Sequence, residues 1–481
     1  MRLLGIWRRL FARRSHSADA GGEAGAPERS LDIRITRELF DRMRTHVEDF
    51  SRGEEGGFLI CSLSRLEDRD VLLAREWMPI PDRAISRGDD GSVLSWSAEF
   101  NNEVLERAVA LDATPVLVHS HGSTSPEFSP DDRRKERPLF GTFSKLVAPL
   151  PTGTLLLGRG DAAGSFWLDG RNCLRFRRLV IVGERIETWY SPDGTAPVRA
   201  ARERLNRQNL AIGPESDAQL ARATVAVVGV SGGGSHVVQQ MSHQGIGTLI
   251  AIDDQTVDES NLGRLVGATE ADIDKTLKVD LARRVATGID SSIEVLRVVE
   301  RFPSKAAIEM LRQADVVVAC LDRFDAREAV NAFCRRYLIP LVDIGMEIRS
   351  AGEHLARADG QLIVSLPGQP CMRCWFLTDA DLEQERQDRP AGYDRNPDAP
   401  GDPQVVSMNG VLASEASNCV LDLITGYSGG RRGAKVWQYD GRSGHLEPCD
   451  LPSHRPDCPA CAEEGCGDPS PLTHIQTTTE V

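Results

Sequence analysis

The stretch that most limits the fold of this chain is "ATVAVVGVSGGGSHVVQQMSHQGIGTLIAIDD", residues 223–254. It contains a short apolar run, a glycine-rich turn, a segment of helical length and a second apolar run that ends in aspartate. Apolar runs joined through a helix form parallel strands that are buried on both faces. Because "ADVVVACLD" and "IPLVDIG" continue the pattern, we predict a doubly wound α/β sheet from about residue 200 onward.

The glycine-rich turn of this unit is suited to a phosphate. Glycine lets the backbone approach an anion, and the helix that follows offers free N–H groups and a favourable dipole. Asp253 follows at the distance where an acidic side chain can bind a ribose. The pattern Gly229-x-Ser231-x-x-Gly234 lacks the middle glycine of a dinucleotide site. Taken alone, this Rossmann-like unit would also suit an oxidoreductase.

The residues beyond the second strand favour adenylation. "DESNLGRL", a lysine and "ACLDRFDAREAVN" resemble the ThiF/MoeB/HesA superfamily, which includes ubiquitin-activating enzymes. The resemblance implies that Mg-ATP adenylates the C-terminal glycine of a ubiquitin-like protein. It implies a nucleotide site made of turn glycines, a ribose ligand, phosphate ligands and a Mg²⁺ ligand: Gly229, Gly232, Gly234, Asp253, Asn261, Arg264, Lys278, Asp322, Arg327 and Asn331.

Three members of this set carry the implied catalysis. Arg264 and Lys278 would surround the phosphates, and Asp322 would hold Mg²⁺. Lys275 is the alternative to Lys278, which lies one residue beyond the family spacing. "RLNRQNLAIG" resembles the entry helix of the same family, and its Arg207 would reach ATP in the other subunit. This implies a homodimer formed through the C-terminal domain.

The second motif is "VLVHSHGSTSPEFSPDD", residues 116–132. His119 and His121 project to one face of an extended strand, because side chains alternate with a period of two. Two imidazoles and the carboxylate of Asp132 suit Zn²⁺ with one position left open for water. The pattern therefore predicts a catalytic zinc site, whose reaction would still need a carboxylate to move a proton.

Here the sequence resembles the JAB/MPN (JAMM) metalloproteases, in which His-x-His, seven residues and Ser-x-x-Asp follow a glutamate. The resemblance implies His119, His121 and Asp132 as zinc ligands and Ser129 as a donor to the oxyanion. It implies Glu54 as general acid/base, by its spacing from a strand glycine, with Glu55 as the alternative. Gly122 stands where many members have proline.

Two C-x-x-C pairs lie near the C-terminus, and four thiolates close a tetrahedral zinc site with no open position. We therefore predict a structural zinc ion bound by Cys371, Cys374, Cys458 and Cys461. No cysteine stands between residues 375 and 410, where ubiquitin-activating relatives often carry a thioester cysteine. Cys466 remains as a weak thioester candidate on a mobile tail, with Cys419 next.

The predicted organisation has five parts. These are a basic, disordered tail (1–29) or short interfacial helix, a mixed α/β JAB/MPN-like domain (30–190), a linker and entry helix (191–205), a ThiF-like adenylating domain (206–466) and a flexible tail (467–481). In the second part we expect Leu39, Phe40, Met43, Val47 and Phe50 to form one face of a helix. Residues 378–406 should form a surface loop.

Composition sets the remaining limits. The net charge of −14 argues against nucleic acid as a general partner. No apolar run is long enough to span a membrane, and eleven cysteines without a secretion signal indicate a reducing, cytoplasmic setting.

Together the motifs predict a bacterial fusion that activates a ubiquitin-like protein and also processes or deconjugates it, with an E2-like or sulfur-donor partner. The alternatives are sulfur-carrier activation for cofactor or cysteine biosynthesis, and a non-catalytic scaffold.

Overall fold

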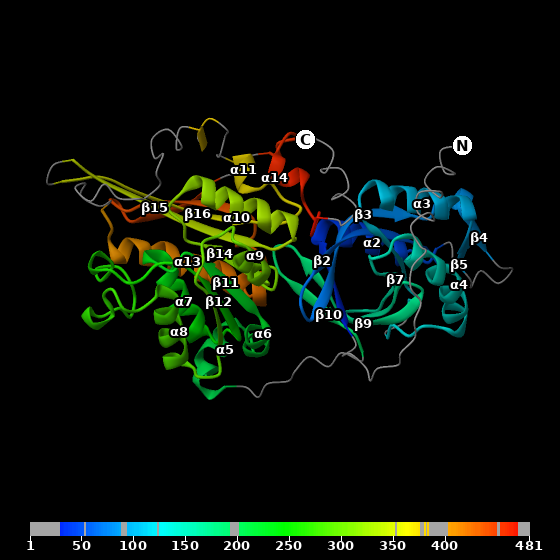
Figure 1. The fold of residues 1–481 in the computed structure, drawn as a ribbon, viewed down its shortest axis with the longest axis horizontal. Coiled ribbons are helices and arrows are strands. Elements are labelled where there is room, and N and C mark those ends of the chain that lie inside the picture. Colours follow the sequence, from blue (N-terminus) through cyan, green and yellow to red (C-terminus); the bar gives the residue numbers. More distant parts are fainter. Residues whose placement is uncertain are drawn as a thin grey trace, which may run out of the picture.

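The computed structural model describes residues 29–51, 54–87, 94–122, 125–192, 202–351, 354–375, 380, 382–383, 403–449 and 453–469. Two α/β units lie side by side, the first drawn in blue to teal and the second in green to red (Figure 1). Residues 1–28 of the predicted basic tail, residues 193–201 of the linker and most of the predicted surface loop lie outside the described residues.

The first unit is built on a sheet with the strand order β1-β3-β2-β6-β7-β8-β9-β10. Because β1 pairs with both β3 and β9, the sheet closes on itself. Its strands are β1 (Ser30–Thr36), β2 (Gly56–Arg65), β3 (Arg69–Pro79), β6 (Thr114–His119), β7 (Thr152–Leu157), β8 (Ala162–Leu168), β9 (Arg171–Val182) and β10 (Glu187–Tyr190). β4 (Ile85–Arg87) and β5 (Leu94–Trp96) form a separate hairpin.

Three helices cover this sheet: α2 (Arg37–Val47), α3 (Ala98–Ala110) and α4 (Pro130–Leu146). The predicted apolar face of α2 is confirmed for Leu39, Phe40, Met43 and Val47, which are all buried. The prediction is wrong for Phe50. The helix ends before it, since the Glu48 N–H closes the last turn on the Arg44 carbonyl, and Phe50 is 42% exposed.

The second unit has the strand order β13-β12-β11-β14-β15-β16-β17-β18. The first five strands in this order are parallel, as the sequence predicted, and the last three continue the sheet antiparallel. The strands are β11 (Thr224–Val228), β12 (Thr248–Ile252), β13 (Glu294–Val298), β14 (Val316–Ala319), β15 (Leu341–Ala351), β16 (His354–Ser365), β17 (Lys435–Asp440) and β18 (His445–Cys449).

Helices pack on both faces of this sheet, with one buried cluster under α7, α8 and α13 and another under α9 and α10. The helices are α5 (Asn206–Ile212), α6 (Ser216–Arg222), α7 (Gly232–Gln244), α8 (Lys278–Ile289), α9 (Lys305–Leu311), α10 (Phe324–Arg336), α11 (Met372–Trp375), α13 (Val406–Thr425) and α14 (Pro459–Ala462). Within the described part of the chain, none of the helices is long and apolar enough to cross a bilayer.

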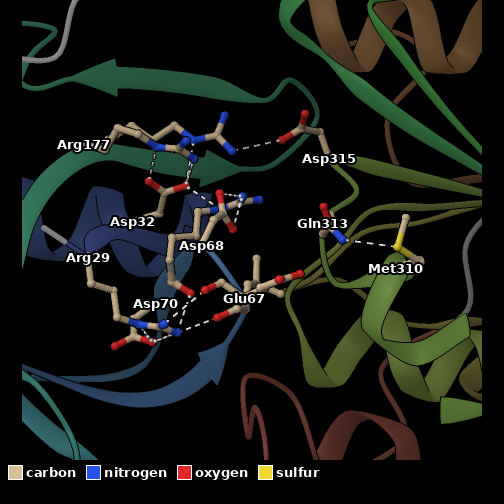
Figure 2. A network of polar contacts seen from close by, with 12 residues as sticks. Arg29, Asp32, Glu67, Asp68, Asp70, Arg177, Met310, Gln313 and Asp315 are labelled. Carbon is tan, nitrogen blue, oxygen red and sulfur yellow. Dashed lines mark hydrogen bonds and ion pairs between the residues drawn. The ribbon is translucent and has the colours of Figure 1, made fainter. Parts of the chain in front are cut away.

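Charged side chains line the junction between the two units (Figure 2). Asp32 of β1 accepts hydrogen bonds from Arg177 and Arg178 of β9 at 2.6 and 2.9 Å. Burial opposes the ionisation of Asp32, but the two arginines outweigh burial and lower its pKa to about 2. Arg178 also lies 3.6 Å from Asp315, the residue before β14. One ionic network therefore extends from the first sheet to the residue that precedes β14 in the second sheet.

Candidate active sites and the four-cysteine cluster

The His-x-His motif lies at an end of the first sheet. His119 is the last residue of β6, and it pairs with Gly56 at the start of β2. Glu54 precedes β2 by two residues, so this pairing brings it beside the histidines. Asp132 lies in the first turn of α4. Three separate segments thus place the predicted acid/base and the predicted ligands in one small volume.

The distances agree with a shared site. His119 Nε2 lies 3.4 Å from the Asp132 carboxylate and 3.8 Å from that of Glu54. The corresponding distances from His121 Nε2 are 3.2 and 3.6 Å. Burial opposes ionisation of Asp132, but the two neighbouring histidine rings hold the pKa of its carboxyl well below the usual range. Asp132 is therefore a carboxylate at neutral pH.

Ser129 occupies the N-cap of α4. Its hydroxyl donates to Asp132 Oδ2 at 2.7 Å, and the Asp132 N–H donates back to the hydroxyl at 3.2 Å. This reciprocal capping box satisfies free N–H groups of the first turn. It also orients the carboxylate toward the histidines. In the structure Ser129 thus positions Asp132, while its predicted contact with an oxyanion stays a prediction.

These residues fit a zinc ion on an observation independent of the motif. Among the described residues, neither ring nitrogen of the buried His119 has a hydrogen-bond partner. Buried polar atoms without partners are costly, and a metal ion would satisfy Nε2. Glu54, His119 and His121 each offer a ligand atom within 4.8 Å of the others, and Asp132, the predicted third ligand, lies 3.4 and 3.2 Å from the two rings. Two imidazoles and an ionised carboxylate are typical ligands of a catalytic zinc.

The glycine-rich turn lies at the carboxyl edge of the second sheet, where neighbouring parallel strands commonly bind ligands. Gly229, Asp253 and Asp322 follow the ends of three adjacent strands, β11, β12 and β14. Gly229 has φ +87°, and a Cβ there would lie 2.7 Å from the Cys320 carbonyl oxygen, so only glycine fits. The Val230 N–H donates to Asp253 Oδ2 at 2.9 Å and holds the turn against β12.

Lys278 is brought into this site. It begins α8, it is buried, and its Nζ donates to Gln255 Oε1 at 2.6 Å. Burial lowers the pKa of Lys278. The negative charges of Asp253 and Asp322 partly offset this lowering, because they stabilise the ammonium group. Lys275, the alternative, is exposed. The structure therefore favours Lys278 as the lysine of the nucleotide site.

The remaining predicted nucleotide ligands fall into two groups. Arg264 and Asn261 lie beside the turn: a Cβ on Gly232 would lie 3.4 Å from Arg264 Cδ, and Asn261 is buried in the short 3₁₀ turn Glu259–Asn261. Arg327 and Asn331 lie further along α10. Arg327 pairs with Asp343 of β15, with Nε 3.0 Å from the carboxylate, and the Asn331 amide oxygen accepts the Met372 N–H at 3.3 Å.

Two residues near the nucleotide turn were not predicted. Asn409 of α13 is buried, and its Nδ2 would lie 2.6 Å from a Cβ on Gly232, so its amide covers the start of α7. Gln255 orients Lys278. No sequence signal pointed to either residue, because Asn409 lies far along the chain from the turn and Gln255 is one polar residue in a polar loop.

The four predicted cysteine ligands come together. Cys371 Sγ lies 3.5 Å from Cys458 Sγ and 3.9 Å from Cys374 Sγ, and Cys374 Sγ lies 3.7 Å from Cys461 Sγ. A tetrahedron with zinc–sulfur bonds of about 2.3 Å would separate its sulfur atoms by about 3.8 Å. The cluster therefore has the dimensions of a structural zinc site.

Arg207 of α5 is exposed, and Leu210 one turn later is 88% exposed. Arg207 thus lies on the surface of this chain, and its supply to the ATP of another subunit stays a prediction.

Fold and sites define a protein class: a mixed α/β domain with a His-x-His site joined to a doubly wound α/β domain with a glycine-rich turn at its carboxyl edge. The ThiF family matches residues 205–460, more than half of the chain, and the protein belongs to this family. Residues 36–168 match the prokaryotic homologs of the JAB domain. The chain is therefore a fusion of an N-terminal JAB domain with a C-terminal, E1-like ThiF domain.

Characterised relatives resemble the second half. The SAMP-activating enzyme E1 of Haloferax volcanii is 27% identical over 55% of this chain and 90% of its own length. The sulfur carrier protein ThiS adenylyltransferase of Escherichia coli is 28% identical over 54% of this chain and 94% of its own length. The mouse adenylyltransferase and sulfurtransferase MOCS3 is 28% identical over 54%, but the match spans only 53% of that protein. Among solved structures, E. coli MccB with ATP matches at TM-score 0.45 and 20% identity, over 55% of this chain and 76% of MccB.

Proposed function

We propose that this protein adenylates the C-terminal glycine of a ubiquitin-like protein and that its JAB domain cleaves the same protein from a precursor or a target. The observation that carries the proposal is that both sites keep a full set of reactive side chains. Lys278, Asp253 and Asp322 converge at the nucleotide turn. Glu54 and Asp132 lie within 4 Å of both histidine rings.

The nucleotide site suits attack of a tail carboxylate on the α-phosphate of ATP, with pyrophosphate leaving. Charge develops on the phosphate oxygens in this reaction, and fixed positive groups stabilise it without reorganisation. Lys278 is fixed in this way by Gln255. The N-terminus of α7 adds free N–H groups to the phosphate side of the site. Asp322, three residues after the end of β14, is the proposed Mg²⁺ ligand.

The JAB site suits hydrolysis of an amide bond after a glycine-rich tail. His119, His121 and Asp132 would hold a zinc ion, which when bound supplies a Lewis acid and lowers the pKa of water. Glu54 lies beside both rings and is half-buried. It would take the proton of the attacking water and pass it to the leaving amine, the usual task of a general acid/base.

The second candidate is sulfur-carrier activation, in which a sulfur donor attacks the adenylate and the JAB domain releases the product. Two of the relatives, MOCS3 and the ThiS adenylyltransferase, are named for a sulfurtransferase or a sulfur carrier protein, whereas the relative from Haloferax volcanii is named as an activating enzyme E1. The absence of a cysteine between residues 375 and 410 favours this candidate over a thioester-forming enzyme. A scaffold without turnover is disfavoured by the two complete sets of reactive groups.

The first test is ATP–pyrophosphate exchange driven by ubiquitin-like and sulfur-carrier proteins encoded near this gene. We expect exchange with a partner whose tail ends in glycine, and a fall to background when the last glycine is removed, since the reacting carboxylate is then displaced. NAD binding in place of ATP, or exchange that does not depend on the tail, would contradict the proposal.

The second test concerns the step after adenylation, for which we expect no thioester on this chain. Burial raises the pKa of Cys419 to about 12, and burial also raises the pKa values of Cys320 and Cys334, so these thiols form little thiolate. Cys466 is held at the C-terminal end of α10. This helix starts two residues after Asp322 and spans 13 residues, so its length of about 20 Å separates Cys466 from the residues near Asp322.

The measurement is a non-reducing gel after incubation with Mg-ATP and the ubiquitin-like partner, and adenylate should accumulate without a covalent adduct. A thiol-sensitive adduct that disappears in Cys466→Ala would place the thioester on the C-terminal segment. An adduct that survives this change would point to a buried cysteine, Cys419 first.

The proposal includes a homodimer through the second unit. Leu210 is a large apolar side chain left almost fully exposed beside Arg207 on the short helix α5. We propose that a second copy covers Leu210 and that Arg207 then serves the nucleotide of that copy.

A further inference from the structure

The chain does not end at the second cysteine pair but continues into the junction between the two units. We call residues 463–468 the C-terminal segment. Figure 1 shows it in red, running from α14 toward the first sheet. It lies along the end of α10, because the Gly465 N–H donates to the Arg335 carbonyl at 3.1 Å and the Gly467 N–H donates to the Arg336 carbonyl at 3.0 Å.

The flexible tail predicted from residue 467 therefore starts too early, because Gly467 and Asp468 are hydrogen-bonded to the rest of the structure.

Asp468 completes an open end of the first sheet. The pairing of β2 with β6 stops at Cys61 and Thr114. Beyond this point the Asp468 N–H donates to the Leu63 carbonyl at 2.7 Å, and the Arg65 N–H donates to Asp468 Oδ2 at 2.7 Å. Asp468 thus takes the place of a strand neighbour for two backbone groups of β2.

The other carboxylate oxygen of Asp468 binds the second unit. Its Oδ1 accepts from Arg312 Nη1 at 2.6 Å and from the Tyr337 hydroxyl at 2.9 Å. One carboxylate therefore joins β2 of the first unit to the segments after α9 and α10 of the second. Hydrogen bonds with charged partners are stronger than neutral ones, and this group makes one to an arginine within a half-buried junction.

The approach of the C-terminal segment to β2 requires a glycine. Gly467 has φ +65°, and a Cβ there would lie only 2.4 Å from the Leu63 carbonyl oxygen. Real Cβ atoms do not come so close to a backbone oxygen, so a side chain would push the segment off the strand. The tight contact indicates that the segment is fitted to this surface.

Apolar and polar contacts surround this point. Leu66, Val71 and Leu73 of the first unit belong to the same buried cluster as Phe333 and Leu338 of the second. On β1, the strand that pairs with β3, Arg34 donates to the carbonyls of Tyr337 and Ala314 at 2.8 and 3.3 Å. Figure 2 shows the ionic groups that border this junction, with Asp32 and Arg177 on one side and Asp315 on the other.

The four-cysteine cluster anchors the C-terminal segment. Cys458 is the N-cap of α14 and Cys461 lies within this helix, and the segment starts two residues after Cys461. Glu464 accepts from Arg335 Nη1 at 2.7 Å and from the Gly368 N–H, three residues before Cys371, at 3.0 Å. The loops that carry both cysteine pairs thus fix the start of the segment.

We infer that the C-terminal segment is a clasp that fastens the JAB domain to the adenylating domain, with the four-cysteine site as its anchor. The clasp lies away from both sites. Glu54 precedes one end of β2, and Leu63 and Arg65 lie at the other end. The ten residues of this strand span about 30 Å and separate the clasp from the JAB site. The junction contacts the residues that precede β14, whereas the nucleotide residues follow its carboxyl end. The clasp thus fixes how the two sites are oriented without contributing to either.

The test is Asp468→Ala in the full chain, with Asp440→Ala as the control. The Asp440 carboxylate binds only within its own turn, to Ser443 and the Arg442 N–H, among the described contacts. In Asp468→Ala the amide proton of Arg65 loses its acceptor, so its hydrogen–deuterium exchange should become at least about tenfold faster. Exchange in β7, which does not touch the segment in the described structure, should not change.

A second measurement reports on the fastening itself. A site-specific protease sequence placed between Pro192 and Arg202 lets the folded chain be cut into two halves that are then diluted. The wild type and Asp440→Ala should stay associated, and Asp468→Ala should weaken the association by about 10²-fold. Equal dissociation constants for all three, or unchanged exchange at Arg65, would overturn the clasp.

Removal of the cysteine-bound metal tests the anchor. Wild-type protein stripped by a chelator should show the same faster exchange at Arg65 and the same weaker association as Asp468→Ala. Metal-free protein whose Arg65 amide stays protected would show that the segment holds the two units without its anchor, and the metal part of the inference would be wrong.

Discussion

Replacing Glu54 by glutamine is expected to slow cleavage of a ubiquitin-like fusion by about 10²–10⁴-fold, the usual contribution of a general acid/base. Glutamine keeps the size of the side chain and an oxygen near His119 and His121 but cannot accept the proton of water. The zinc content should stay at the wild-type level, because the two imidazoles and Asp132 remain. Steady-state cleavage and metal analysis on the same preparation measure both effects.

Glu55→Gln is the matched control, since Glu55 is the neighbouring glutamate and the alternative from sequence. Glu55 is buried and its carboxylate lies 3.9 Å from His46 rather than beside the His-x-His pair. Its replacement should leave cleavage within a few-fold of the wild type. Full activity in Glu54→Gln together with lost activity in Glu55→Gln would exchange the two assignments. Full activity in both would remove the general base from this loop.

Much of both sites could be predicted because each is encoded by short spacing. His119 and His121 share a strand end, and Ser129 and Asp132 share one capped helical turn. The carboxyl ends of β11, β12 and β14 meet at one edge whatever the details of the loops. Such local geometry depends on neighbouring residues and on the strand order, and not on the details of side-chain packing. A single sequence is therefore enough to predict it.

What could not be predicted depends on contacts between distant segments. β16, β17 and β18 extend the sheet antiparallel. β17 and β18 are short and mostly exposed or half-buried, and the apolar run of β16 is limited to Leu362, Ile363 and Val364, so no long apolar run reveals these strands. Asn409 reaches the nucleotide turn only through the packing of α13 on α7. Asp468 follows a cysteine pair and a polar stretch, which in sequence is typical of a solvated tail. Its role depends on β2, some 400 residues earlier, and no periodicity records such a pairing.

The other large effect is expected from Lys278→Met, which should lower ATP–pyrophosphate exchange by about 10²–10³-fold. Methionine keeps an unbranched side chain of similar length but removes the positive charge from the nucleotide site. The developing charge on the phosphate would then lack a fixed partner, and Asp253 and Asp322 would lose the ammonium group on which their charges act. Exchange at saturating ATP, driven by the cognate glycine-terminated protein, measures the effect.

Lys275→Met separates this role from a general loss of charge. The two lysines lie three residues apart, and the family spacing alone left both open, but Lys275 is exposed whereas Lys278 is buried against Gln255. The expected result is near wild-type exchange in Lys275→Met. Because Lys278→Met leaves the Gln255 amide oxygen without its donor, the thermal unfolding midpoint of each variant must be compared. A Lys278→Met protein that unfolds like the wild type and still exchanges normally would contradict the nucleotide site proposed here. The JAB domain offers an internal reference, since the peptidase activity proposed for it should be unchanged in both lysine variants.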